Sequence, residues 1–73
     1  MDRNEVEEII RDFAPDALPL FADHWGRWPV GPTANEVQNL LWDAEYRYRD
    51  FGCIIEANKC HQAAVEIGLR RNS

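Results

Sequence analysis

The chain has 73 residues, 45% of them hydrophobic, and its 13 acidic and eight basic side chains give a formal net charge of −5. This length allows one small domain, 1–73, whose composition is too apolar for a disordered tail and too charged for a membrane span. With one serine, one threonine, one lysine and no common nucleotide- or metal-binding motif, the chain is not expected to be an enzyme, and neither a cofactor nor a metal is expected.

The first predicted helix spans residues 3–13. Asp2 and Glu5 have the spacing of a capping box, in which side chains accept hydrogen bonds from the amides at the start of a helix. The apolar residues that follow share one helical face: Val6, Ile9, Ile10 and Phe13. Pro15 ends this helix, because a proline disfavours the helical conformation of the residue before it.

A second, shorter helix is predicted over residues 17–25. Asp16 can cap it, and Pro19 is tolerated in the first turn, where backbone amides have no partner within the helix. The apolar side of this helix consists of Ala17 or Leu18, Phe21 and Trp25.

Residues 26–33 are predicted to form a loop, because they contain two glycines and two prolines. Tryptophan is common in binding hot spots, and Trp28 lies in this loop beside Arg27. We therefore expect Arg27 and Trp28 to contact a partner, whereas Trp25 and Trp42 are expected to fill the core.

The third predicted helix spans residues 34–70, begins with a capping box from Thr33 to Glu36 and contains no proline. An unbroken helix of this length would measure about 55 Å, whereas a compact chain of 73 residues is about 29 Å across. The helix therefore either breaks near Gly52 or projects from the globule and meets a partner.

Two lines of apolar residues follow this segment on different sides of the helix. The first line contains Val37, Leu41, Ala44, Tyr48, Phe51, Ile55, Val65 and Leu69, and the second contains Trp42, Tyr46, Cys53, Ala57, Cys60, Ala64 and Ile67. Two apolar sides favour burial on both, because a surface helix of a monomer normally has one apolar face.

We therefore favour an all-α homodimer, in which two short N-terminal helices pack on one long helix, continuous or gently kinked at Gly52. A glycine inside a helix costs only about 1 kcal/mol relative to alanine. The expected dimer interface comprises Cys53, Ala57, Cys60, Ala64 and Ile67. The alternative is a monomeric four-helix bundle with a break at Gly52.

The net charge lies entirely in residues 1–24, which hold seven acidic and two basic side chains, a balance of −5, while residues 25–73 hold six of each. Glu5, Glu8 and Asp12 form the expected acidic face, which suits a protein partner with a basic surface. Direct nucleic-acid binding is disfavoured. A chain with an isoelectric point of about 4.8 is negatively charged at neutral pH and lacks the electrostatic attraction to phosphate groups that such binding needs.

These features predict a cytoplasmic, non-enzymatic regulator or inhibitor that acts by occupying a surface of a larger protein, with no role at a membrane. Small acidic chains of this kind are common among phage-type inhibitors of host machinery. The alternative is a helix-turn-helix-like transcription regulator that binds DNA with its first two helices.

Overall fold

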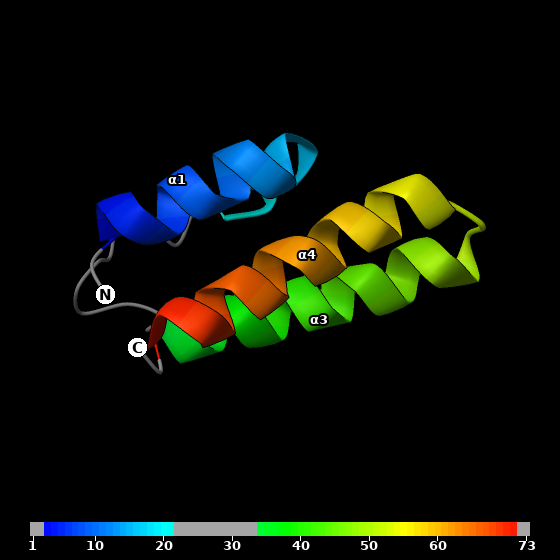
Figure 1. The fold of residues 1–73 in the computed structure, drawn as a ribbon. Helices are drawn as coiled ribbons and strands as arrows, with labels where there is room; N and C mark the ends of the chain where they lie inside the picture. The colour runs from blue at the N-terminus through cyan, green and yellow to red at the C-terminus, as the bar shows by residue number, and fades with distance from the viewer. Residues whose placement is uncertain (1–2, 22–33, 72–73) are drawn as a thin grey trace.

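The structure is a computed structural model that describes residues 3–21 and 34–71 (Figure 1). Within these ranges it contains four helical elements and no strand, so the all-α prediction is confirmed there: α1 (Arg3–Phe13), η1 (Pro15–Phe21), α3 (Ala34–Asp50) and α4 (Ile54–Arg71). The radius of gyration, 11.4 Å, agrees with the value of about 11 Å expected for a compact chain of this length. None of the helices in the described ranges has the length and hydropathy needed to span a membrane.

α1 spans Arg3–Phe13, the same bounds that the capping and periodicity signals predicted. The side chains of Val6, Ile9 and Ile10 are fully buried, so the predicted apolar face is the one that packs on the rest of the molecule. Asp2, the predicted cap, lies outside the described residues.

The second helix differs from its prediction in both its start and its type. η1 is a 3₁₀ helix that begins at Pro15, and the N–H of Ala17 donates to the carbonyl oxygen of Ala14 at 2.9 Å. Pro15 and Pro19 each lack an N–H, which leaves an α-helical ladder incomplete and favours the tighter turn. Ala17 and Phe21 are buried as predicted. Trp25, and the loop with Arg27 and Trp28, lie outside the described residues.

A turn at Gly52 divides the segment that the sequence predicted as one long helix. Gly52 has a φ of 79°, its N–H donates to the carbonyl oxygen of Arg49, and the N–H of Cys53 donates to that of Tyr48. This pair of bonds, at 3.1 and 2.8 Å, is a Schellman motif, which ends a helix with a left-handed glycine. The prediction of a continuous or gently kinked helix over 34–70 is therefore wrong, and the alternative break at Gly52 is confirmed.

α3 and α4 fold back on each other as an antiparallel hairpin (Figure 1). The end of α4 lies beside the start of α3, where Arg71 donates to the side-chain oxygens of Asn35 and Gln38, each at 3.0 Å. The Nε2 of Gln38 also donates to the carbonyl oxygen of Ala64 at 2.9 Å, so polar contacts join the two helices as well as apolar ones.

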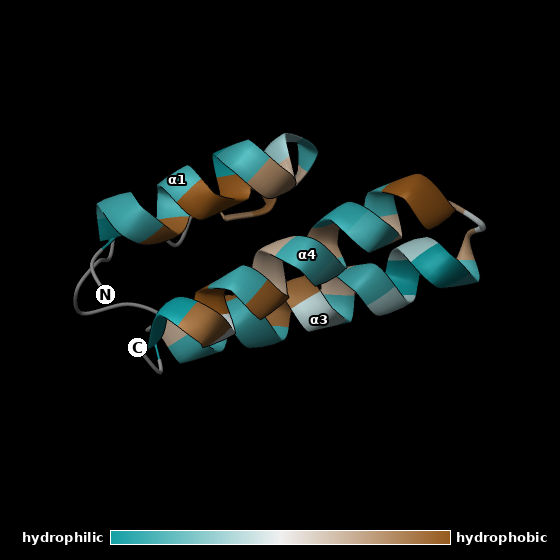
Figure 2. Ribbon diagram, in the orientation of Figure 1, coloured by the Kyte–Doolittle hydropathy of each residue, from teal (hydrophilic) through white to brown (hydrophobic). Residues whose placement is uncertain are grey.

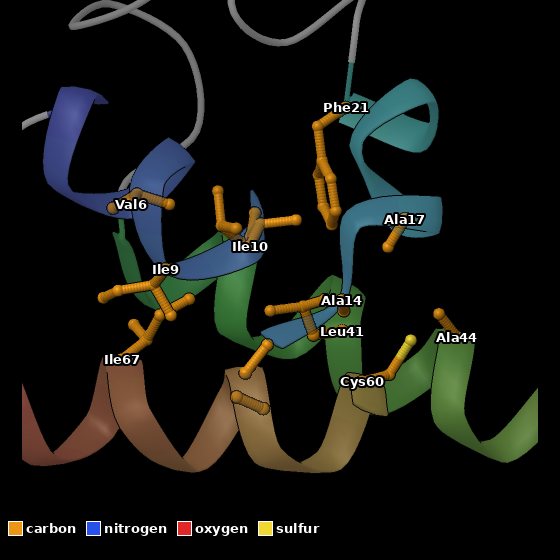
Figure 3. Close-up of a cluster of buried hydrophobic side chains, with 13 residues drawn as sticks. Val6, Ile9, Ile10, Ala14, Ala17, Phe21, Leu41, Ala44, Cys60 and Ile67 are labelled. Carbon is orange, nitrogen blue, oxygen red and sulfur yellow. The ribbon is translucent and has the colours of Figure 1, made fainter. Parts of the chain in front are cut away.

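The core lies between this hairpin and the N-terminal elements, with α1 packed along α4 (Figure 3). α3 buries members of the first apolar line and α4 buries members of the second. The buried residues of the hairpin are Val37, Leu41, Ala44, Ala57, Cys60, Ala63, Ala64 and Ile67.

The structure places most of the predicted dimer interface in the interior of the single chain. Ala57, Cys60, Ala64 and Ile67 are each at most 2% exposed within the single chain, because α1, η1 and α3 already cover them. They leave no surface for a second copy to contact. Only Cys53, in the turn between the helices, is exposed.

Candidate functional site

An apolar groove runs between η1 and α3 and has a volume of about 340 Å³. Its walls comprise Leu20, Phe21, Leu40, Asp43, Ala44, Arg47, Tyr48 and Phe51. The short 3₁₀ helix places Phe21 into the core (Figure 3). The adjacent Leu20 is exposed and lines the groove. The groove therefore depends on the position of η1 relative to α3, since each of the two elements supplies one wall.

Helix geometry explains why α3 contributes both apolar and charged side chains to this groove. At 100° per residue, Leu40 lies at the edge of the buried face of α3, and Phe51, the first residue after that helix, continues the same edge. They are 36% and 83% exposed, so the apolar surface of α3 extends beyond the part that the core covers. Such contiguous exposed apolar surface marks interaction sites in small proteins.

The outer edge of α3 carries a strip of charges next to the groove. Asp43, Arg47 and Asp50 fall within an arc of about 60° on the helix and are all exposed. Arg47 pairs with Asp43 at 3.2 Å between Nη2 and Oδ2, and both side chains are more than half exposed. We call the carboxylates of Asp43 and Asp50 the acidic rim, and Arg47 offsets one of these two charges.

The apolar surface continues onto the turn between α3 and α4. Phe51, Ile54 and Ile55 are exposed there, and Figure 2 shows the first turn of α4 as strongly hydrophobic. The Schellman motif at Gly52 fixes this turn, so these side chains project from a defined backbone. We call Phe51, Ile54 and Ile55 the apolar tip.

The predicted acidic face is present as a surface feature of α1. Glu5, Glu8 and Asp12 are all exposed, and their spacing of three and four residues places them on one side of the helix. The opposite side of α1 is buried in the core, which holds these carboxylates in a fixed position. Their contact with a partner stays a prediction.

A polar cluster joins α3 to α4 on another part of the surface. The Glu45 carboxylate accepts hydrogen bonds from Arg49 and from Nδ1 of His61, at 2.9 and 3.0 Å, and Arg49 also donates to Asn58 at 3.1 Å. The ring of Trp42 lies 5.1 Å from that of His61 in an edge-to-face contact. Burial opposes ionisation of Glu45, but the Arg49 and His61 contacts outweigh it, so the pKa of this carboxyl is lowered.

This cluster links α3 to α4, because the Glu45 carboxylate on α3 accepts hydrogen bonds from Arg49 on α3 and from His61 on α4. We call it the Glu45 clamp.

Two kinds of chemistry are not supported by the other candidate side chains. Burial raises the pKa of the Cys60 thiol, which keeps the thiol protonated and a poor nucleophile. Among residues 3–21 and 34–71, no three side chains of His, Cys, Asp or Glu lie close enough together to hold a metal ion.

Many of the described arginines already have an acidic partner. Arg11, Arg47, Arg49 and Arg70 each form an ion pair with a carboxylate four residues away. The four consecutive residues 46–49 alternate tyrosine and arginine, so they point to different sides of α3, and both of these arginines are paired locally. Tyr48 packs partly into the core, and Tyr46 is exposed.

Sequence reasoning missed the groove because the groove depends on where η1 lies relative to α3. Leu40 belonged to neither apolar line, and its position beside Leu41 was the available signal that α3 has a wider apolar surface. Comparisons with known proteins found no matching family model, no similar curated protein and no similar solved structure.

Proposed function

We propose that this chain is a non-enzymatic regulator or inhibitor that binds a larger protein through the groove between η1 and α3. One observation carries the proposal: a small acidic domain leaves an apolar groove of about 340 Å³ open, with Leu20, Leu40 and Phe51 exposed along it. Exposing large apolar side chains to water opposes solubility, and a partner that covers them recovers the hydrophobic free energy. Phage-type inhibitors of host machinery are one class that acts by such occupation.

A homodimer is the competing explanation, because a second copy of the chain could cover the same groove. The small residues of α4 are buried in the single chain, so a second copy has the groove and the apolar tip to bind. Size-exclusion chromatography with light scattering distinguishes the two cases. We expect a monomer mass of about 8.5 kDa at tens of micromolar protein.

DNA binding is the weaker candidate, and no observation in the described residues favours it. The exposed surface of α1 carries Glu5, Glu8 and Asp12, and η1 is a seven-residue 3₁₀ helix rather than a recognition helix. An electrophoretic shift of DNA at low salt would support that alternative instead.

Site-specific photo-crosslinking in cells tests the proposal. A crosslinking amino acid is placed at Phe51, beside the groove, and separately at Leu69, an exposed apolar residue of α4 that does not line it. We expect a defined adduct with one protein from position 51 and not from position 69. Equal adducts from both positions, or none from either, would contradict the proposed function.

A further inference from the structure

We propose that the segment that occupies the groove is a basic amphipathic helix: about three turns long, with an apolar stripe flanked by lysine or arginine. This inference rests on the proposed function, because it names the chemistry of the partner at the same groove. Two independent features carry it, the length of the apolar wall and the charge beside it.

The length of the wall defines the length of the occupant. Leu40 and Phe51 stand at the two ends of the wall on α3 and are eleven residues apart, which corresponds to about 16 Å along the helix axis. A partner helix covers that distance in about three turns, with apolar residues at positions i, i+4, i+7 and i+11. A volume of 340 Å³ admits the side chains of one helix face, while the backbone of the partner stays outside the groove.

The opposite wall supports the same geometry. Leu20 and Phe21 come from η1 and face α3 across the groove, so an inserted side chain meets apolar groups on both sides. Helix-in-groove recognition uses this arrangement, with a few spaced anchors in an apolar channel. The 3₁₀ helix offers no unpaired strand edge, so strand addition is not the mode that this surface suits.

The charge beside the groove selects a basic partner. The acidic rim contributes two carboxylates and Arg47 contributes one positive charge, so the edge of the groove carries one net negative charge. The formal net charge of the whole chain is −5. A second copy would bring the same rim and would itself carry a net charge of −5, so electrostatics oppose a homodimer here and attract a helix rich in lysine or arginine.

Three synthetic peptides test this inference on the full chain. The basic peptide is a three-turn helix with leucine at i, i+4, i+7 and i+11 and lysine on both flanks. The acidic peptide replaces each lysine with glutamate, and the stripe control replaces each leucine with serine. Binding is measured by titration at low and high salt, and the contact surface is mapped by backbone amide NMR shifts.

We expect the basic peptide to bind at least about tenfold more tightly than either of the other two. Its amide shifts should concentrate at Leu40, Arg47 and Phe51, and its affinity should fall as salt is raised. Leu40→Gln should weaken binding about tenfold or more, while the matched Leu69→Gln should leave it unchanged. Phe51→Gln provides a second groove variant whose largely exposed side chain makes it tolerant of substitution.

Three results would overturn the inference, and they separate it from the proposed function. Equal binding of the acidic peptide, or no binding of the basic one, overturns the basic-helix partner while a crosslink from position 51 still supports the function. Shifts centred on Glu5, Glu8 and Asp12 would place the basic helix on α1 instead. Self-association that Phe51→Gln abolishes would show that a second copy occupies the groove.

Discussion

The side-chain nitrogen of Gln38 lies 2.7 Å from the position that a Cβ atom on Gly68 would occupy. This nitrogen crosses from α3 to donate a hydrogen bond to the carbonyl oxygen of Ala64, one turn before Gly68 in α4. The missing side chain at Gly68 is therefore what lets Gln38 reach the α4 backbone and join the two arms of the hairpin.

This relationship predicts a coupling between the two positions. Alanine in place of a glycine inside a helix ordinarily adds about 1 kcal/mol of stability, and Gly68→Ala should do so in a Gln38→Ala background. In the native background the gain should shrink by about 1 kcal/mol, because Gln38 must give up its hydrogen bond. Chemical unfolding of the two single variants and the double variant measures the coupling. The same gain in both backgrounds would show that Gln38 does not depend on Gly68.

The turn at Gly52 predicts an effect whose sign separates the hairpin from a continuous helix. Gly52 has a φ of 79° and no atom within 4 Å of an added Cβ, so substitution there changes only backbone strain. Gly52→Ala should lower the free energy of unfolding by about 1 kcal/mol or more. Gly52→Asn should lose less, since asparagine tolerates the left-handed conformation. A continuous helix would instead be stabilised by Gly52→Ala, as alanine has the higher helix propensity.

The clamp around Glu45 predicts a pH dependence of stability. Its folded-state pKa lies below the ordinary value of 4.5, because the contacts from Arg49 and His61 outweigh the effect of burial. The stabilisation is therefore fully present above about pH 4.5 and is lost as the pH falls through the folded-state pKa. Unfolding free energies of the native chain and of Glu45→Gln, measured from neutral to acid pH, should converge at low pH. A constant difference across that range would show that ionised Glu45 contributes nothing.

The acidic face on α1 predicts an effect on the rate of association. Reversing Glu5, Glu8 and Asp12 to lysine changes the formal net charge from −5 to +1, since each substitution adds two positive charges. If the groove makes the contact and α1 only attracts a basic partner, the association rate constant should fall about tenfold at low salt, with little change in dissociation. Surface plasmon resonance with the crosslinked partner separates the two rates. Faster dissociation would show that the acidic face itself lies in the interface.

The parts of the fold that could be predicted from sequence are those determined by local signals. The capping residues, the periodic apolar residues and Pro15 gave the bounds of α1, and Val6, Ile9 and Ile10 are buried as their spacing predicted. The helix end at Gly52, by contrast, depends on the left-handed conformation that a Schellman motif requires. That demand is not visible in a segment such as Phe51–Gly52–Cys53, which lacks the polar residues of most loops.

The two apolar lines contained the evidence for the break, but their meaning depends on tertiary structure. The first line is interrupted at Asn58 and Gln62, which are exposed on α4, whereas the second line is buried there. A change of buried side between α3 and α4 indicates that the chain reverses, since each arm of a hairpin buries its own face. Residues of the second line were attributed to a dimer interface, although the single chain buries most of them: Ala57, Cys60, Ala64 and Ile67.

The groove could not be predicted, because it is formed by two elements whose contact is not local in sequence. Leu20 precedes a buried phenylalanine and Leu40 precedes a buried leucine, so each pattern by itself looks like the edge of an ordinary core helix. Only the packing of η1 beside α3 makes these two edges face each other. The basic protein partner expected from the sequence stays a prediction, and the acidic rim adds a second reason for it.

The affinity of the crosslinked partner for matched leucine variants tests the central claim most directly. Leu40 lines the groove and Leu69 does not, and both are apolar residues on exposed helix surface. We predict that Leu40→Gln weakens binding of the purified partner about tenfold or more, as removal of a central apolar contact does, while Leu69→Gln binds as the native chain does. Equal affinities of the two variants, with both folded by circular dichroism, would contradict the groove as the binding site.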